Sequence, residues 1–225
     1  GHSDYEYLPD GARQWTAGKY WKKLNDIGRV VVSSAEGTGR MPDLVALCEV
    51  ENDSVMTGLT RHSLLRGFGY GYLMTSSPDA RGIDVALLYQ PDRFHPVRHY
   101  PLRVEPLPGM RSTRDILYVA GRAASGDTLH VFVVHAPSRL GGAAHTDPFR
   151  MQVARRLLAS ADSILAVSPG AKILVAGDFN DEAGGKSIVF LSEHGLKDVA
   201  PRTDTAPGVE GSYRYKGRWQ TIDHV

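Results

Sequence analysis

A carboxylate and an amide lie two positions apart in LVAGDFND, residues 174–181. Side chains two apart on a strand share a face and are separated by ~6.6 Å, so we expect Asp178 and Asn180 to project together while Phe179 points into packing. A carboxylate oxygen can bind a hard divalent cation, and an amide can orient a nucleophilic water or a phosphoryl oxygen. The alternative interpretation is that GDFND is simply a polar turn.

A second acid lies near the end of the apolar run LVALCEV, residues 44–50. We expect Glu49 to continue the face formed by Val45 and Leu47, and to lie where a buried strand leaves the core. An unpaired charge at that point is costly unless a partner or a metal compensates it. The alternative is an exposed strand-end acid, an interpretation that suits Glu51.

A histidine ends the apolar strand of VFVVHAPSR, residues 131–139. Pro137 stops the strand just beyond His135 and leaves Arg139 in the following loop. His135 can donate a hydrogen bond or a proton to a phosphate oxygen, and Arg139 can pair with the same group. A lone histidine at a strand end is more often structural. The repetition of three apolar strands that end in such groups favours a functional site.

Further arginines precede two of the expected strands. Arg81 lies before IDVALLY and Arg114 before ILYVAG, so both are candidates for a phosphate pocket. The alternative for each is a solvated or salt-bridged arginine, with Asp115 as a partner for Arg114. Asp84 lies inside an apolar strand and needs a partner, for which an arginine or His135 is a candidate.

These groups need strands that end at a common edge, and the rest of the chain supplies such elements. Apolar spacing of three and four predicts helices over 20–32, 53–66, 149–167 and 186–194. Strands are predicted over 44–50, 70–75, 83–89, 92–100, 116–123, 128–135 and 171–177, with a hairpin around 216–217. The segments 103–114 and 201–211 are expected to be long loops. Strands outnumber helices and the helices come in isolated blocks, which indicates an α+β fold of two packed mixed sheets with outer helices.

Composition sets limits on the class of protein. The 225 residues, 42% of them hydrophobic, can bury the core of one domain. Because 26 Lys and Arg balance 25 Asp and Glu, a nucleic acid would have to be held by a local patch. The single cysteine, Cys48, excludes a disulfide framework and a cysteine zinc site. No apolar run is long enough for a membrane span. We find neither a tryptophan platform for base stacking nor a basic stripe with interleaved aromatics.

Five motifs occur in the order PDLVALCEVEN, RGIDVALLY, VVHAPSR, GDFND and WQTIDHV. Together they resemble the endonuclease/exonuclease/phosphatase superfamily over nearly the whole chain. The resemblance implies a four-layer αββα sandwich and hydrolysis of phosphoester bonds with Mg²⁺ or Mn²⁺. The histidine of VVHAPSR is similar to the deoxyribonuclease I branch. The abasic-site branch has tyrosine at this position.

Position by position, the resemblance implies that Glu49 binds the metal. Asp178 and Asn180 would handle the attacking water and the scissile phosphate, and His135 would contact the phosphate or assist the leaving group. Asp223 would orient a general-base histidine that family members supply from a later SDH motif.

The chain departs from the family pattern at both ends. The SDH motif and the asparagine-bearing first strand are absent, so we expect residues 1–225 to be a single catalytic domain truncated at both ends. His224 follows Asp223, but adjacent strand residues face opposite ways, so His224 is interpreted as structural. Loss of a general base costs ~10²–10⁴ in rate, and the chain alone is expected to be impaired.

Three hypotheses about function remain open. The His135 motif favours a phosphodiesterase acting on nucleic acid. The nearly neutral charge balance also allows a phosphatase or a phospholipase-like enzyme acting on small or lipid phosphoesters. A non-catalytic binding module of the same fold is the third. In each case we expect a monomer with a phosphoester ligand, and the sequence gives no prediction of the cell compartment.

Overall fold

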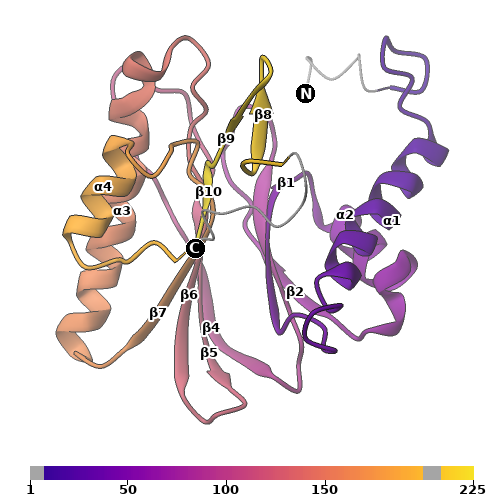
Figure 1. The fold of residues 1–225 in the computed structure, drawn as a ribbon, viewed down its shortest axis with the longest axis horizontal. Coiled ribbons are helices and arrows are strands. Elements are labelled where there is room, and N and C mark those ends of the chain that lie inside the picture. The colour runs from indigo at the N-terminus through magenta and orange to yellow at the C-terminus, as the bar shows by residue number, and fades with distance from the viewer. Residues whose placement is uncertain (1–7, 200–208) are drawn as a thin grey trace.

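Two stacked β-sheets lie between two layers of helices in the computed structural model, which describes residues 8–199 and 209–225 (Figure 1). One sheet carries α3 and α4 on its outer face, and the other carries α1 and the short helices that follow the first strand. This arrangement confirms the predicted α+β fold of four layers, αββα.

The smaller sheet has three antiparallel strands in the order β1-β3-β2. Their bounds are Leu44–Val50 for β1, Gly71–Met74 for β2 and Asp84–Tyr89 for β3. Its outer face packs against α1, Ala17–Ser33, and against α2, Asp53–Thr57, with the helical turns η2, Gly58–His62, and η3, Leu64–Gly67. The apolar residues buried in this layer include Leu24, Val31, Met56, Leu59, Leu65 and Leu88.

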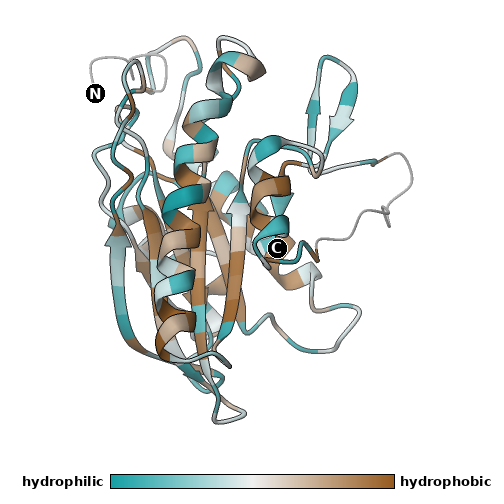
Figure 2. Cartoon of the chain, turned by 90° about the vertical axis from the view of Figure 1, so that its left-hand side faces the viewer, coloured by the Kyte–Doolittle hydropathy of each residue, from teal (hydrophilic) through white to brown (hydrophobic). Residues whose placement is uncertain are grey.

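The larger sheet has five strands in the order β10-β7-β6-β5-β4. In chain order they are β4 Phe94–Leu102, β5 Ile116–Ala123, β6 Thr128–His135, β7 Lys172–Asp178 and β10 Asp223–His224. All neighbours are antiparallel except β6 and β7, which are parallel and are joined by the helix α3, Ala143–Val167. Both α3 and α4, Lys186–Glu193, lie over hydrophobic strands (Figure 2).

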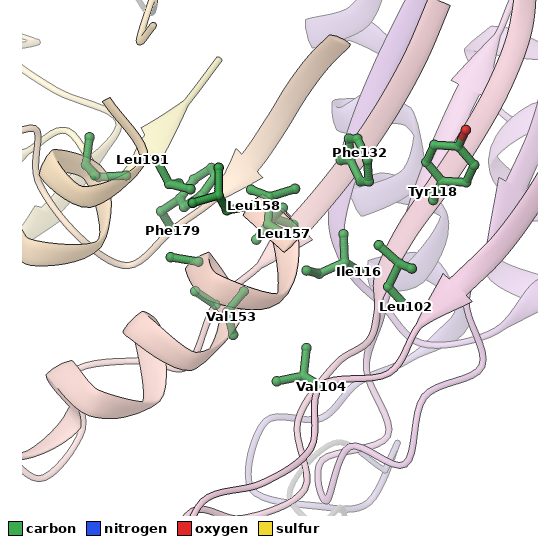
Figure 3. Packing of buried hydrophobic residues seen from close by; sticks show 14 of the residues in the cluster. Leu102, Val104, Ile116, Tyr118, Phe132, Val153, Leu157, Leu158, Phe179 and Leu191 are labelled. Carbon is green, nitrogen blue, oxygen red and sulfur yellow. The ribbon is translucent and has the colours of Figure 1, made fainter. Parts of the chain in front are cut away.

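Two apolar clusters hold the larger sheet in place. Figure 3 shows the outer cluster, in which Leu157 and Leu158 of α3 pack with Phe132 and Ile116 of the sheet. A second cluster fills the space between the sheets. Its fully buried members are Val85, Leu87, Phe94, Leu117, Val119, Val131 and Val133.

A separate hairpin is formed by β8, Tyr213–Tyr215, and β9, Arg218–Gln220. Its turn residues Lys216 and Gly217 have φ angles of 48° and 81°. Two successive left-handed residues are what a tight two-residue hairpin turn requires. The hairpin predicted around 216–217 is therefore confirmed.

The predicted strands are all present, with ends within two residues of the prediction, and 103–114 lies in a long connection without helix or strand. The predicted loop 201–211 falls largely outside the described residues. Among the described helices, none combines the length and the apolar character needed to cross a bilayer.

The segment after β1 differs from prediction, since 53–66 is not one helix. Ser63 takes extended backbone angles, φ −84° and ψ −168°, and so separates η2 from η3. Asn52 is the N-cap of α2, because its side chain accepts a hydrogen bond from the Val55 amide at 3.1 Å.

Helix α3 also begins six residues earlier than predicted, at Ala143. The residues before Phe149 lack apolar residues at helical spacing, so apolar periodicity does not predict the first turns of α3. Arg150 stabilises them instead: its buried guanidinium donates to the Ala143 carbonyl at 2.9 Å and to Thr146 Oγ1 at 2.7 Å, and it pairs with Asp147.

Candidate active site

Three neighbouring strands place polar side chains side by side. His135 at the end of β6 is in register with Asp178 at the end of β7, and Asp178 is in register with Asp223 of β10. Register partners project from the same face of a sheet. Because His135 is two and four positions from the inter-sheet residues Val133 and Val131, this face is the one turned toward the other sheet.

Glu49 reaches the same place from the smaller sheet through a β-bulge. Cys48 pairs with Val85 and Val50 with Asp84, which leaves Glu49 unpaired in the left-handed region at φ 58°. The predicted continuation of the face of Val45 and Leu47 is wrong, since those residues pack in the cluster under α1. A bulge re-aims a side chain, and here Glu49 faces the site instead.

A cavity of about 790 Å³ brings these side chains together. It is lined by six of the predicted site residues, Glu49, Arg81, His135, Arg139, Asp178 and Asn180. Asp223 lies beside this group as the register partner of Asp178. Glu49 and Asp178 thus border one pocket, as a shared phosphoester site requires.

Asn180 is held in place by three hydrogen bonds. The backbone N–H of Asn180 donates to Asp178 Oδ1 at 2.7 Å, and its side-chain Nδ2 donates to the Ala136 carbonyl at 3.0 Å. Its backbone carbonyl accepts a hydrogen bond from Arg139 Nε at 2.7 Å. Strand β7 ends at Asp178 and Asn180 has φ 50°, so the predicted reason for their common direction, two-residue strand spacing, is wrong. A tight turn, in a conformation that Asn tolerates, places it there.

Arg139 lines the cavity but is already engaged. Besides the Asn180 carbonyl, its guanidinium approaches Asp181 at 3.5 Å and Glu182 at 3.6 Å. Arg81 is more available: it pairs with Glu49 at 3.1 Å, with both side chains more than half exposed. Among the arginines predicted to bind substrate, Arg81 is thus the freest to meet a phosphate.

Arg114 lies outside this cavity. It is buried, pairs with Asp79 at 3.1 Å and donates to the Ala136 carbonyl at 2.7 Å. The suggested partner Asp115 instead lies 3.3 Å from Arg103. Arg114 lines a second cavity of about 390 Å³ that adjoins the first through Arg81, Ser138, Leu140 and Gly141.

Burial shifts the protonation of the two innermost groups. It raises the pKa of Asp178 to about 6, opposed by the hydrogen bond from the Asn180 amide and reinforced by the charges of Asp223 and Glu49. Burial, with the charges of Arg114 and Arg81, lowers the pKa of His135 to about 3. At neutral pH His135 is therefore uncharged and Asp178 is largely ionised.

The ring nitrogens of His135 make no hydrogen bond within the described part of the chain. Its Nε2 lies 3.6 Å from Asp178 Oδ2, longer than a hydrogen bond, and its buried Nδ1 has no hydrogen-bond partner in the described part of the chain. A neutral imidazole next to a cavity can donate one hydrogen bond to an incoming oxygen.

Two residues on the margin are structural. His224 is buried, with Nδ1 3.1 Å from Asp198 and Nε2 2.8 Å from the Asp181 carbonyl, which fits its predicted structural role. Asp84 accepts hydrogen bonds from Thr75 and Ser77, so the expected pairing with an arginine or His135 is not what the structure shows.

The donor set fits a hard divalent cation. No three His, Cys, Asp or Glu side chains within 8–199 and 209–225 form a closed metal cluster. Mg²⁺ does not need one, since it is commonly held by one or two carboxylates together with waters and substrate phosphates. Glu49, Asp178 and Asp223 offer only oxygen ligands. The raised pKa of Asp178 comes mainly from burial, with smaller contributions from the charges of Asp223 and Glu49, and a cation would offset it.

Two aromatic residues in the cavity wall were missed by sequence analysis. Tyr213 and Tyr215 of the hairpin line the cavity together with Asp178 and His135. Residues 213–219 read YRYKGRW and interleave aromatic with basic residues, so the expected absence of such a stripe is wrong. The alternation of aromatic and cationic residues could have identified this hairpin as part of the site.

A four-layer αββα fold with carboxylates and an imidazole on adjacent strand ends is the arrangement expected from the resemblance to the endonuclease/exonuclease/phosphatase superfamily. The sequence profile of the Endonuclease/Exonuclease/phosphatase family matches residues 1–225. The chain belongs to this family.

Solved structures show the same fold at low identity. The catalytic domain of human Nocturnin is 22% identical with a TM-score of 0.65, over 92% of this chain and 73% of that one. A truncated TDP2 from Caenorhabditis elegans is 15% identical with a TM-score of 0.62, over 92% and 77%. ANGEL2, described as a 2′,3′-cyclic phosphatase, is 16% identical with a TM-score of 0.61, over 77% and 48%. No curated protein sequence matches significantly.

Proposed function

We propose that this chain hydrolyses phosphodiester bonds with the help of Mg²⁺ or Mn²⁺, and that nucleic acid is its substrate. One observation carries the proposal. Glu49, His135, Asp178 and Asn180 come from both sheets and a turn, yet they line one cavity of about 790 Å³. Family membership supports the hydrolysis of phosphoesters, and the chemistry of these side chains supports the rest.

The residues divide the work of an in-line displacement. Asp178 accepts a hydrogen bond from the attacking water and takes up its proton, since a carboxylate with a raised pKa is a suitable base near neutral pH. The water oxygen bonds to phosphorus as the bond from phosphorus to the leaving oxygen breaks, and the leaving oxygen takes a proton from solvent. The fixed Asn180 side chain orients that water or a phosphoryl oxygen. Neutral His135 donates a hydrogen bond from Nε2 to a phosphoryl oxygen.

The remaining groups bind the cation, the substrate phosphate or the residues that act on the water. Glu49 would hold the cation, which when bound neutralises charge on the phosphoryl oxygens. Asp223 keeps a negative charge beside Asp178, and that charge favours proton uptake by Asp178. Arg81 pairs with Glu49 and lies free enough to exchange that partner for a substrate phosphate. Arg139 keeps the Asn180 turn in place.

The test is cleavage of supercoiled plasmid DNA by the 225-residue chain with Mg²⁺, with Mn²⁺ and with a chelator. We expect cleavage that requires the metal and is lost in Glu49→Gln. Glu36→Gln, an exposed change outside the cavity lining, is the matched control. Cleavage that persists after complete chelation would contradict the proposal.

Assays with other substrates under the same metal conditions separate the alternatives. Release of inorganic phosphate from monoesters, without DNA cleavage, would identify a phosphatase, and hydrolysis of lipid phosphoesters would identify a phospholipase-like enzyme. Metal-dependent ligand binding without hydrolysis would identify a non-catalytic module. Size-exclusion chromatography tests the accompanying proposal of a monomer.

A further inference from the structure

We propose that Tyr213 and Tyr215 form a stacking platform for unpaired nucleobases next to the scissile phosphate. The chain would therefore prefer single-stranded nucleic acid. This inference rests on the proposed function and deepens it, because it names the form of the substrate and the residues that select it.

The two tyrosines present parallel faces to the cavity. As residues two apart on β8 they share a face of the hairpin, with ring centroids 6.3 Å apart and planes inclined by 13°. Their exposed fractions are 45% and 53%, large for tyrosine rings. Both rings also line the cavity that contains Asp178 and His135, so a ligand stacked on them lies beside the reactive groups.

The opposite face of the hairpin is already occupied. The guanidinium of Arg214 lies 5.6 Å from the Trp219 ring centroid, a cation–π contact across the two strands. Trp219 borders a different cavity from the tyrosines. The tyrosine face is therefore the one that remains for a ligand.

Positive charge accompanies the rings. Lys216 Nζ lies 5.4 Å from the Tyr215 ring centroid, and Arg218, the register partner of Tyr215, adds a second cation on this face of the hairpin. Aromatic rings interleaved with cations bind single strands, because every base has a face to stack and every linkage has a phosphate to pair. The local patch that the nearly neutral chain needs for a polyanion is thus present on the hairpin.

Duplex DNA does not present free base faces, since each base is stacked within the helix. A base must be unpaired or displaced before it can stack on a protein ring. A platform of two exposed rings therefore selects for single strands, while the phosphate contacts of the cavity are shared by both forms.

The experiment compares two ligands of equal charge. One is a fluorescein-labelled oligothymidylate, and the other is a strand of the same length built only from abasic residues. Binding is measured by fluorescence anisotropy in the presence of a chelator, so that hydrolysis does not interfere. The proteins are the wild-type chain, Tyr213→Ala with Tyr215→Ala, the corresponding double phenylalanine variant, and Trp21→Ala on distant α1 as control.

We expect the wild type to bind oligothymidylate about tenfold more tightly than the abasic strand, since stacking on an aromatic side chain is worth ~1–3 kcal/mol per base. The double alanine variant should lose this preference, and the phenylalanine and Trp21 variants should keep it. Equal binding of the two strands by wild type, or an unchanged preference in the alanine variant, would overturn the inference.

The two proposals fail in different ways. If the wild type binds oligothymidylate more tightly than the abasic strand but cleaves neither plasmid nor oligonucleotide, the stacking platform is supported and the nuclease function is contradicted. A wild type that cleaves DNA but ignores the bases keeps the function and removes the platform. The phenylalanine variant also shows whether any loss in the alanine variant comes from misfolding of the hairpin.

Discussion

Asp178 and Asp223 are direct register partners on the antiparallel strands β7 and β10. Like charges placed opposite each other destabilise a sheet, and here the paired stretch of β10 is only two residues long. Asp223 is exposed while Asp178 is partly buried, so the repulsion adds to the cost of burial at Asp178 and raises its pKa. This arrangement is explained by chemistry at the cavity better than by stability.

Replacement of Asp178 should separate activity from folding. We expect Asp178→Asn to lower kcat for phosphodiester cleavage by about 10²–10⁴, because the variant keeps the shape and the acceptor for the Asn180 amide but cannot take up a proton. Asp162→Asn, an exposed change on α3, is the control and should be fully active. Equal activity of the Asp178 variant would remove this residue from the mechanism.

The same variant should change how stability depends on pH. The pKa of Asp178 rises from 3.8 to about 6 on folding, so the folded state holds the proton more tightly than the unfolded state. Stability of the metal-free protein then falls as pH increases between these values, and above pH 6 Asp178→Asn should be more stable than wild type by on the order of 1–3 kcal/mol.

Urea denaturation of both proteins in chelator at several pH values measures this difference, which should vanish below pH 3.8. His135 makes stability depend on pH in the opposite direction, because its lowered pKa removes stability as pH falls below 6.5. This effect is present in both proteins and cancels in the comparison. A difference that does not vary with pH would contradict the role of burial.

The left-handed backbone of Glu49 predicts an unusual order of variant stabilities. Glycine adopts φ 58° without a steric penalty and alanine does not, so Glu49→Gly should be more stable than Glu49→Ala by about 1 kcal/mol. At Glu36, whose φ is not positive, we expect the reverse order. Thermal denaturation compares the four variants, and the same order at both sites would argue against backbone strain at Glu49.

Gly177 is required by the close approach of β7 and β6. Its φ is 147°, and a Cβ at this position would overlap the carbonyl oxygen of Val134. We expect Gly177→Ala to lower the free energy of unfolding by more than about 3 kcal/mol. Gly170→Ala, where a Cβ meets open space, is the matched control. A melting temperature equal to that of the control would show that the two strands can move apart.

The sequence predicts the strands well because their signal is local. Apolar runs that end in polar residues mark the ends of β1, β6 and β7, and these ends meet at one rim as expected. The family resemblance then supplies roles for His135 and Asp178. What the sequence does not contain is the conformation that aims Glu49 and Asn180, since a bulge and a left-handed turn depend on register and on tertiary hydrogen bonds.

Long-range pairing explains the other differences. Arg114 binds Asp79, a residue distant in sequence, rather than its neighbour Asp115. Arg139 is engaged by Asp181 and Glu182 across the turn after β7. Which cation meets which anion is decided by packing, and one-dimensional spacing carries little information about it.

The parallel pairing of β6 and β7 also determines when the cavity can form. His135 and Asp178 become neighbours only after α3 has crossed over and docked, a slow, non-local event in the folding of a sheet. We therefore expect the proposed hydrolytic activity to appear only after β6 and β7 have paired, so that newly synthesised chains do not cleave phosphoesters before the larger sheet is assembled.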